Sequence, residues 1–167
     1  FRPIVRWPSE SVGKQGTVAF LLEDRRKNIW IATAGRGVLR FNLQREDTVW
    51  YREDTGTAGS IPSNAVETLC EDSDGRLRLG TGAGLAEYDS RTDRFKLHRI
   101  FMFERGDSRL GGRKLVSTGV TSGIIPDGRG NLWLSTRAGG IVRFEVATEK
   151  QRAFTTDEGV VVARGRR

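Results

Sequence analysis

The chain has 167 residues, a formal net charge of +7, 37% hydrophobic and 29% charged residues. This balance is typical of one folded globular domain with a hydrophobic core, and it excludes a disordered chain. No run of about 18 apolar residues occurs, so the sequence offers no membrane-spanning helix. The 21 glycines are scattered along the chain, which indicates many tight turns and therefore many short strands.

The predicted elements begin with a single strand in 1–16, where FRPIVRW resembles the end of a preceding sheet. Three groups of four strands follow, because apolar residues alternate in short runs between polar, glycine-containing turns. The expected strands are 18–23, 29–33, one ending at 41, and 48–52; 66–71, 76–81, one ending at 88, and 95–99; 120–125, 131–136, one ending at 144, and 152–156. The corresponding divisions are 1–16, 17–64, 65–118 with a long basic connector, 119–160, and a tail at 161–167.

The three groups are copies of one unit. Asp24, Asp72 and Asp127 each stand six residues before Trp30, Arg78 and Trp133, and Thr33, Thr81 and Thr136 stand three residues after them. Repeats of about 40 to 50 residues with several short strands each are typical of propeller blades. The sequence therefore predicts an all-β β-propeller fragment: about three four-stranded antiparallel blades plus one leading strand. We expect both tryptophans to be buried between blades, the threonine hydroxyls to be structural, and Arg78 to keep its guanidinium at the rim.

The reactive side chains do not form a catalytic set. The single cysteine, Cys70, falls on an inward-facing strand position, which predicts a buried and inert thiol. The single histidine, His98, has no partner at a recognised zinc or triad spacing. No catalytic residue, metal site or cofactor is predicted.

The positive charge suggests an anionic partner, but its distribution disfavours nucleic acid, because arginines and acidic residues alternate along the whole chain. In a propeller, the loops at 34–36, 82–83 and 137–139 would share one face with the connectors 53–64 and 100–118. Loops on a rigid scaffold commonly carry binding sites. We predict an anionic or carbohydrate ligand for this face, and the alternative is a solvated basic surface. The candidate ligand-binding residues are Arg36, Arg137, Arg105, Arg109, Arg113 and Lys114.

Three segments carry a family resemblance: VAFLLEDRRKNIWIATAGRGVLRFN (18–42), VETLCEDSDGRLRLGTGAGLAEYD (66–89) and NLWLSTRAGGIVRFE (131–145). They are similar to the two-component regulator propeller repeat. The resemblance implies the periplasmic or extracellular sensing part of a bacterial inner-membrane protein, with a histidine kinase, often hybrid, or a diguanylate cyclase as output. It also implies that the partners are further blades and the output domains of a longer protein. The connector 100–118 and the segment after Val160 depart from the pattern.

Two other functions stay open at this point. A propeller enzyme of the streptogramin-lyase type would need a histidine base and metal-binding carboxylates, and one histidine on an outer strand argues against it. A protein-interaction scaffold of the WD or kelch type cannot be separated from a sensor by sequence. In either case the first and last blades are expected to expose apolar faces, built from residues such as Leu21, Ile31, Val142 and Phe144, and the isolated chain is expected to associate.

Overall fold

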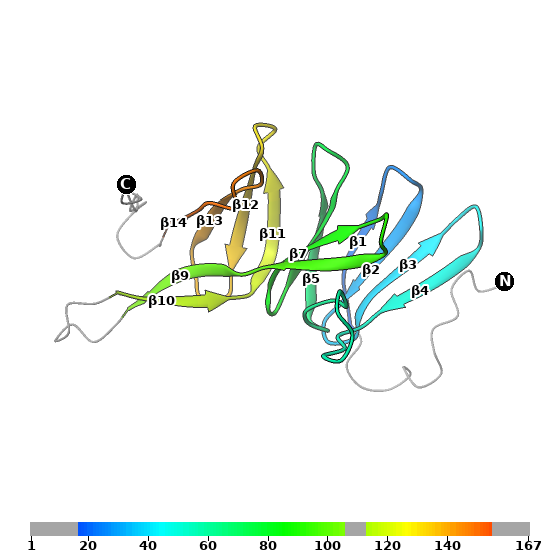
Figure 1. Cartoon of the computed structure of the whole chain (residues 1–167), viewed down its shortest axis with the longest axis horizontal. Coiled ribbons are helices and arrows are strands. Elements are labelled where there is room, and N and C mark those ends of the chain that lie inside the picture. Colours follow the sequence, from blue (N-terminus) through cyan, green and yellow to red (C-terminus); the bar gives the residue numbers. More distant parts are fainter. Residues whose placement is uncertain (1–16, 106–112, 155–167) are drawn as a thin grey trace.

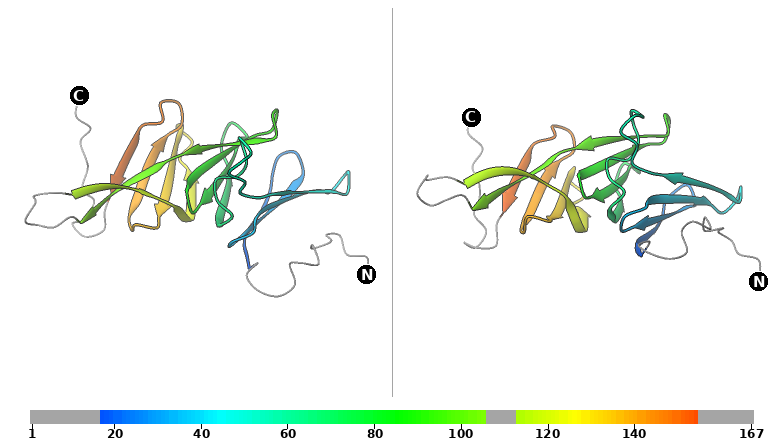
Figure 2. Two further views of the ribbon diagram at one scale, coloured as in Figure 1. Left: turned by 60° about the horizontal axis from the view of Figure 1, so that its bottom comes forward. Right: turned by 90° about the horizontal axis from the view of Figure 1, so that it is seen from below.

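The computed structural model describes residues 17–105 and 113–154, and every regular element within them is a strand. Three four-stranded sheets, which we call blades 1, 2 and 3, each consist of four strands in sequence order. All neighbouring strands within a blade are antiparallel. The blades stand side by side along the molecule (Figure 1, Figure 2). The predicted all-β architecture of three four-stranded blades is confirmed, while the expected leading strand lies outside the described residues.

The strand bounds follow the alternation of the sequence closely. Blade 1 contains β1 (Val18–Glu23), β2 (Asn28–Thr33), β3 (Gly37–Asn42) and β4 (Asp47–Tyr51). Blade 2 contains β5 (Val66–Glu71), β6 (Leu77–Thr81), β7 (Gly84–Asp89) and β8 (Arg94–His98). Blade 3 contains β11 (Val120–Pro126), β12 (Asn131–Thr136), β13 (Ile141–Glu145) and β14 (Gln151–Phe154). The first strands of successive blades contact one another, β1 with β5 and β5 with β11, as in a propeller whose blades fan out from an inner edge.

The recurring aspartate and threonine build the same two turns in each copy. In blade 1, Asp24 Oδ1 accepts the backbone N–H groups of Arg26 and Asn28, and this closes the turn between β1 and β2. The aspartates of blades 2 and 3, Asp72 and Asp127, accept the equivalent pairs of N–H groups. The threonine hydroxyl at the end of the second strand donates to a carbonyl across the next turn, from Thr33, Thr81 and Thr136. These hydroxyls are structural, as predicted.

Two hydrophobic cores hold the blades together. The first lies between blades 1 and 2 and includes Trp30 and Val38 from one sheet, and Leu79 and Phe95 from the other. Ile61, from the linker between the blades, is fully buried in it. The second core lies between blades 2 and 3 and contains Cys70, Leu85, Ile100, Met102, Val120, Ile124, Leu132, Leu134, Val142, Phe144 and Ala153. Blade 2 is therefore packed on both faces.

Three expectations about side-chain orientation are corrected. Arg78 does not reach the rim: its side chain is completely buried between blades 2 and 3. Trp30 is completely buried as predicted, but Trp133 is only half-buried, because it faces away from blade 2 and packs on Phe154. Val142 and Phe144 are buried against blade 2, so the outer face of blade 3 is formed by the residues that alternate with them.

The connector 100–118 contains regular structure. Its strands β9 (Ile100–Arg105) and β10 (Arg113–Thr118) form a two-stranded antiparallel hairpin. Ile100 and Met102 are fully buried in the second core. The side-chain amide of Gln151 holds β9 beside β14, accepting from the Phe101 N–H and donating to the Arg99 carbonyl. The hairpin strands have the sequences IFMFER and RKLVST, and the charged residues in and between them favoured a loop over strands.

Candidate functional site

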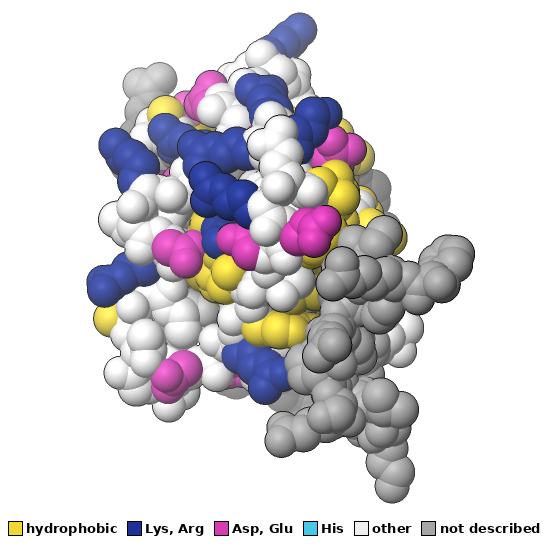
Figure 3. Space-filling view, turned by 90° about the vertical axis from the view of Figure 1, so that its right-hand side faces the viewer, with side chains coloured by type: hydrophobic (Ala, Val, Ile, Leu, Met, Phe, Trp, Pro, Cys, Tyr) yellow, Lys and Arg dark blue, Asp and Glu magenta, His cyan; other side chains and the backbone are white. Residues whose placement is uncertain are grey.

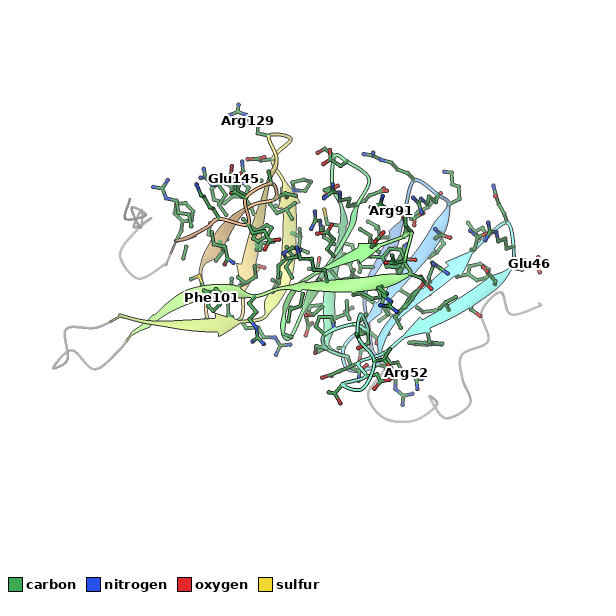
Figure 4. The ribbon with its side chains drawn as sticks, in the orientation of Figure 1. Glu46, Arg52, Arg91, Phe101, Arg129 and Glu145 are labelled. Atoms are coloured by element: carbon green, nitrogen blue, oxygen red, sulfur yellow. The ribbon has the colours of Figure 1, made fainter. Side chains whose placement is uncertain are left out.

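The loops divide between two opposite edges of the molecule, as the propeller topology requires. In Figure 4, Arg129, Arg91 and Glu46 mark one edge. In each blade, this edge carries the turn between the first and second strands and the turn between the third and fourth strands. Arg52 and Phe101 mark the opposite edge, where the linker 52–65 and the hairpin begin. The β2–β3 turn lies on this second edge, since the N–H groups of Gly35 and Gly37 both donate to the linker carbonyl of Asn64. We call this second edge the linker edge.

The basic residues predicted to bind a ligand come from separate parts of the linker edge. Arg36 lies in the β2–β3 turn of blade 1, where its N–H donates to Thr33 Oγ1. Arg137 lies in the corresponding turn of blade 3, and its guanidinium pairs with Glu67 Oε1 at 2.5 Å. That ion pair already engages Arg137 with blade 2.

Three of the four remaining candidates belong to the hairpin. Arg105 and Arg113 end β9 and begin β10 and are direct cross-strand partners, with Lys114 next to them. Arg109 lies outside the described residues, and the side chains of the other three are not described. The structure therefore brings Arg105, Arg113 and Lys114 to one place along the backbone, with Arg36 on a different blade. Whether these residues bind a ligand stays a prediction.

A buried charge cluster between blades 2 and 3 was not predicted. Arg78 donates through Nε to Asp72 Oδ2 at 3.1 Å and through one terminal nitrogen to Glu87 Oε2 at 2.6 Å. His98 Nε2 lies 2.9 Å from the same Glu87 oxygen. The His98 hydrogen bond, together with the charge of Arg78, lowers the pKa of Glu87 to about 2 although burial opposes this. The cluster is thus built around a carboxylate that stays ionised.

His98 links this cluster to blade 3. Its Nδ1 atom lies 3.5 Å from Glu149 Oε1, and Lys96 Nζ contacts the same oxygen at 2.6 Å. The imidazole also meets the edge of the Phe144 ring, with the ring centres 5.2 Å apart. The carboxylate partners of His98 come from the neighbouring strand and from the next blade, so spacing rules for triads or metal sites could not reveal them.

A second polar cluster joins blades 1 and 2. Asp93 Oδ1 accepts the hydroxyls of Tyr51 at 2.6 Å and Tyr88 at 2.5 Å, and Arg40 approaches it at 3.2 Å. Burial acts to raise the pKa of Asp93, but the two tyrosine hydrogen bonds and the charge of Arg40 together lower it. Arg40 also lies over the rings of Trp30 and Tyr51. This arrangement is suited to holding two blades together.

The sequence contains one cysteine, Cys70. Cys70 is buried as predicted, and burial raises the pKa of its thiol, which disfavours the reactive thiolate. Among residues 17–105 and 113–154, no group of three or more His, Cys, Asp or Glu residues could hold a metal ion. The described part of the chain also has no helix long and apolar enough to cross a membrane.

Several known proteins are similar to this chain in sequence or in fold. No family model matches the chain. It is 26% identical, over 187 aligned residues, to histidine kinase P4 of Formosa agariphila, in an alignment covering 88% of this chain and 13% of the kinase. The extracellular domain of a putative hybrid two-component system from B. thetaiotaomicron matches 92% of the chain with a TM-score of 0.63 and 23% identity. The corresponding domain of a second such system from that bacterium matches 90% with a TM-score of 0.66 and 17% identity.

These similarities establish the fold of the chain. The solved extracellular domains share the arrangement of blades, and the chain spans only 19% and 20% of their lengths. Three blades are thus a small part of the proteins that the chain resembles.

Proposed function

We propose that this chain is a segment of an extracytoplasmic sensor propeller in a bacterial two-component signalling protein. The observation that supports it best is the three-blade fold, which resembles extracellular domains of putative hybrid two-component systems over nine-tenths of the chain. The similarity to a histidine kinase points to the same class. In this role the blades bind a ligand or transmit its binding, and phosphoryl or cyclase chemistry belongs to other domains.

The chain itself is proposed to be non-catalytic. Its buried polar clusters are occupied by mutual hydrogen bonds and ion pairs, and its histidine side chain is 4% exposed. A lyase mechanism would need a base that can reach a substrate. Lyase or hydrolase activity of the chain that disappears in a His98→Ala variant with a native fold would contradict this part of the proposal.

The extracytoplasmic location can be tested by cysteine labelling of the full-length protein in intact cells. Cys70 is buried, so the folded blades offer no accessible thiol at that position, and an added cysteine on an exposed turn provides a new labelling site. Glu46 is exposed at a turn and serves as the labelling site in a Glu46→Cys variant. We expect a membrane-impermeant maleimide to label the variant in intact cells, with the unmodified protein as control. Labelling only after lysis would contradict an extracytoplasmic location.

The ligand is proposed to be an anionic oligosaccharide bound at the linker edge by Arg36, Arg105, Arg109, Arg113 and Lys114, because arginine forms bidentate contacts with carboxylates. Arg137 is expected to contribute less, since Glu67 already pairs with it. Calorimetric titration with oligogalacturonate, compared with a neutral oligosaccharide of equal length, tests this proposal. Arg105→Ala/Arg113→Ala should weaken binding more than Arg129→Ala at the opposite edge. Equal affinity for the neutral sugar would exclude the anionic class.

A further inference from the structure

Both ring nitrogens of His98 lie toward carboxylates, and the two carboxylates belong to different blades. Nε2 lies 2.9 Å from Glu87 Oε2 of blade 2, and Nδ1 lies 3.5 Å from Glu149 Oε1 in the turn between β13 and β14 of blade 3. The histidine side chain is 4% exposed. Its Nδ1 atom is buried and has no hydrogen-bond partner in the part of the chain that the structure describes. His98 therefore spans an interface between blades with one nitrogen paired and the other unpaired.

The cations around the ring keep both carboxylates ionised. Arg78 donates to Glu87 Oε2 at 2.6 Å, and the pKa of Glu87 is about 2. Lys96 donates to Glu149 Oε1 at 2.6 Å, and this hydrogen bond lowers the pKa of Glu149. The charged groups that face the ring, directly or through one of these carboxylates, are Arg76, Arg78, Glu87 and Lys96 of blade 2 with Asp72 behind Arg78, and Glu149 of blade 3. The imidazole thus lies between two anions over the pH range in which histidines titrate.

The two carboxylates determine which nitrogen of the neutral ring carries the proton. An ionised carboxylate can only accept a hydrogen bond, so we assign the proton to Nε2, where it is donated to Glu87. Nδ1 is then a bare acceptor, and the Glu149 oxygen that it faces across the interface is an acceptor too. Two acceptors cannot form a hydrogen bond, and a buried polar atom without a partner is costly. Neutral His98 therefore leaves the contact between blades 2 and 3 open at Nδ1.

We propose that His98 is a pH-dependent lock between blades 2 and 3, in which a proton taken from solvent onto Nδ1 creates a charged hydrogen bond to Glu149. The protonated imidazole donates from both nitrogens, and a charge-assisted N–H···O bond is about 2.7–2.9 Å long. The Glu149 side chain is 51% exposed, so it can approach without repacking the core. The ring keeps its place, because Glu87 and the edge of the Phe144 ring hold it.

The lock lies beside the base of the β9–β10 hairpin. Two residues beyond Glu149, the Gln151 amide already binds the Arg99 carbonyl and the Phe101 N–H, at the point where β8 passes into β9. Closing the contact between His98 and Glu149 adds a second attachment of blade 3 at this point. Acidification should therefore restrain the β13–β14 turn and the hairpin base together. This inference rests on the contacts of His98 and not on the proposed sensing role.

Nuclear magnetic resonance can follow this ring by itself, because the sequence contains one histidine and the full chain can be produced without a histidine tag. At pH 8, the ring nitrogen shifts should show a proton on Nε2 and none on Nδ1. On titration toward pH 5, the range in which imidazoles gain a proton, an Nδ1–H signal protected from exchange with water should appear. A proton on Nδ1 at pH 8, or a ring that stays neutral down to pH 5, overturns the proposal.

Amide hydrogen exchange tests whether the new bond links the blades. The protection that Glu149 gives to the β13–β14 turn, relative to Glu149→Ala at the same pH, should be roughly three- to tenfold larger at pH 5.5 than at pH 8. The matched control is Glu46→Ala, at the left-handed position of the equivalent turn in blade 1, which should leave this protection unchanged. Circular dichroism verifies each fold, and the wild-type ring titration needs no variant. Equal protection at both pH values, or the same pH dependence in a His98→Gln background, overturns the proposal.

Discussion

Trp30 and Arg78 occupy the same position in successive copies, and their surroundings show how one site accepts an indole or a guanidinium. Both side chains donate to Oδ2 of the aspartate six residues earlier, Trp30 Nε1 at 2.7 Å and Arg78 Nε at 3.1 Å. The cross-strand partner changes with the residue: Arg40 stands opposite Trp30, and Glu87 stands opposite Arg78. The arginine is thus buried with two carboxylates, which satisfies the requirement that a buried charge be paired.

Truncation of Trp30 should be far more destabilising than truncation of Trp133. Trp30 is completely buried and packs against Tyr51 and Tyr88, so Trp30→Ala should cost about 3–5 kcal/mol of unfolding free energy. Trp133→Ala should cost clearly less because that indole is half-buried. Urea unfolding of both variants measures the difference, and equal losses would show that blade 3 holds its tryptophan as tightly as blade 1.

Glu87 should make stability depend on pH in the acidic range. Its pKa is about 2 in the folded chain against an ordinary value of 4.5, so the unfolded chain binds its proton more readily. The stabilisation, up to roughly 3 kcal/mol, is therefore fully present above pH 4.5 and is lost as the pH falls toward 2. The stability difference between wild type and Glu87→Gln should shrink across this window in urea unfolding. A difference that stayed constant from pH 6 to pH 2 would show that the fold does not hold the Glu87 carboxylate ionised.

Sequence could identify the Trp30 and Arg78 position but not the environment of the arginine. The six-residue spacing from the aspartate marks one structural site in every copy. The Arg78 guanidinium is buried because it pairs with Glu87, which is nine residues away and lies on the same side of the sheet. That information lies in the register between β6 and β7, which sequence alone leaves open.

At the scale of elements, the turn between the second and third strands limits what the chain can tolerate. Gly37 has φ of +83°, and a Cβ there would overlap the Tyr51 carbonyl oxygen and lie 2.9 Å from Ile61 Cδ1. Gly140 repeats this in blade 3, where a Cβ would overlap the Phe154 carbonyl oxygen. The glycine is therefore required because the fourth strand passes directly over the turn.

Substitutions at two glycines in different turns separate the energetic cost of backbone strain from the cost of this steric overlap. Gly128 has φ of +69° with nothing near an added Cβ, so Gly128→Ala should cost only the left-handed backbone penalty of about 1–2 kcal/mol. Gly37→Ala should cost a further 1–3 kcal/mol, roughly, because the fourth strand must move. Chemical denaturation of the two variants gives the comparison. Similar losses at both sites would mean that β4 yields easily to the added methyl group.

Strands were the most predictable elements, and the connector was the least. Blade strands alternate apolar and polar residues in runs such as NIWIAT, so their pattern specifies both their existence and their buried face. The β9–β10 hairpin is anchored in the second core through Ile100 and Met102 of β9. The charged residues of the hairpin favour a loop in the sequence. The contact of β9 with β14, which holds β9 in place, is visible only in the structure.

At the scale of the whole molecule, the three blades form a stack with blade 2 in the middle. One core joins blade 2 to blade 1 and a separate core joins it to blade 3. The end blades lack such cover on parts of their surface: Leu21 is 60% exposed on blade 1, and Ile125 is 65% exposed on blade 3. Figure 3 looks onto the blade 1 end, where hydrophobic side chains lie beside a cluster of Lys and Arg.

The sequence predicted exposed apolar end faces but assigned some residues to the wrong side of the sheet. Leu21 and Ile31 share the face of blade 1 that points away from blade 2, as expected, although Ile31 is only 9% accessible. Val142 and Phe144 lie on the face toward blade 2 and are completely buried. Alternation separates the two faces of a strand without saying which face meets the neighbouring blade. That choice follows from the direction in which the blades are stacked.

Amide hydrogen exchange should therefore rank the blades by their position in the stack. Exchange from a core strand requires opening of the structure that covers it, and β6 and β7 of blade 2 are covered on both faces by buried residues. They should exchange most slowly and approach the global unfolding rate. β1 should exchange fastest among the blade strands, because almost all of its residues are exposed and it lies at the edge of blade 1. Mass spectrometry of the full chain resolves these strands. If β1 were protected as strongly as β6, the blades would open as one unit, and the central position of blade 2 would not determine local stability.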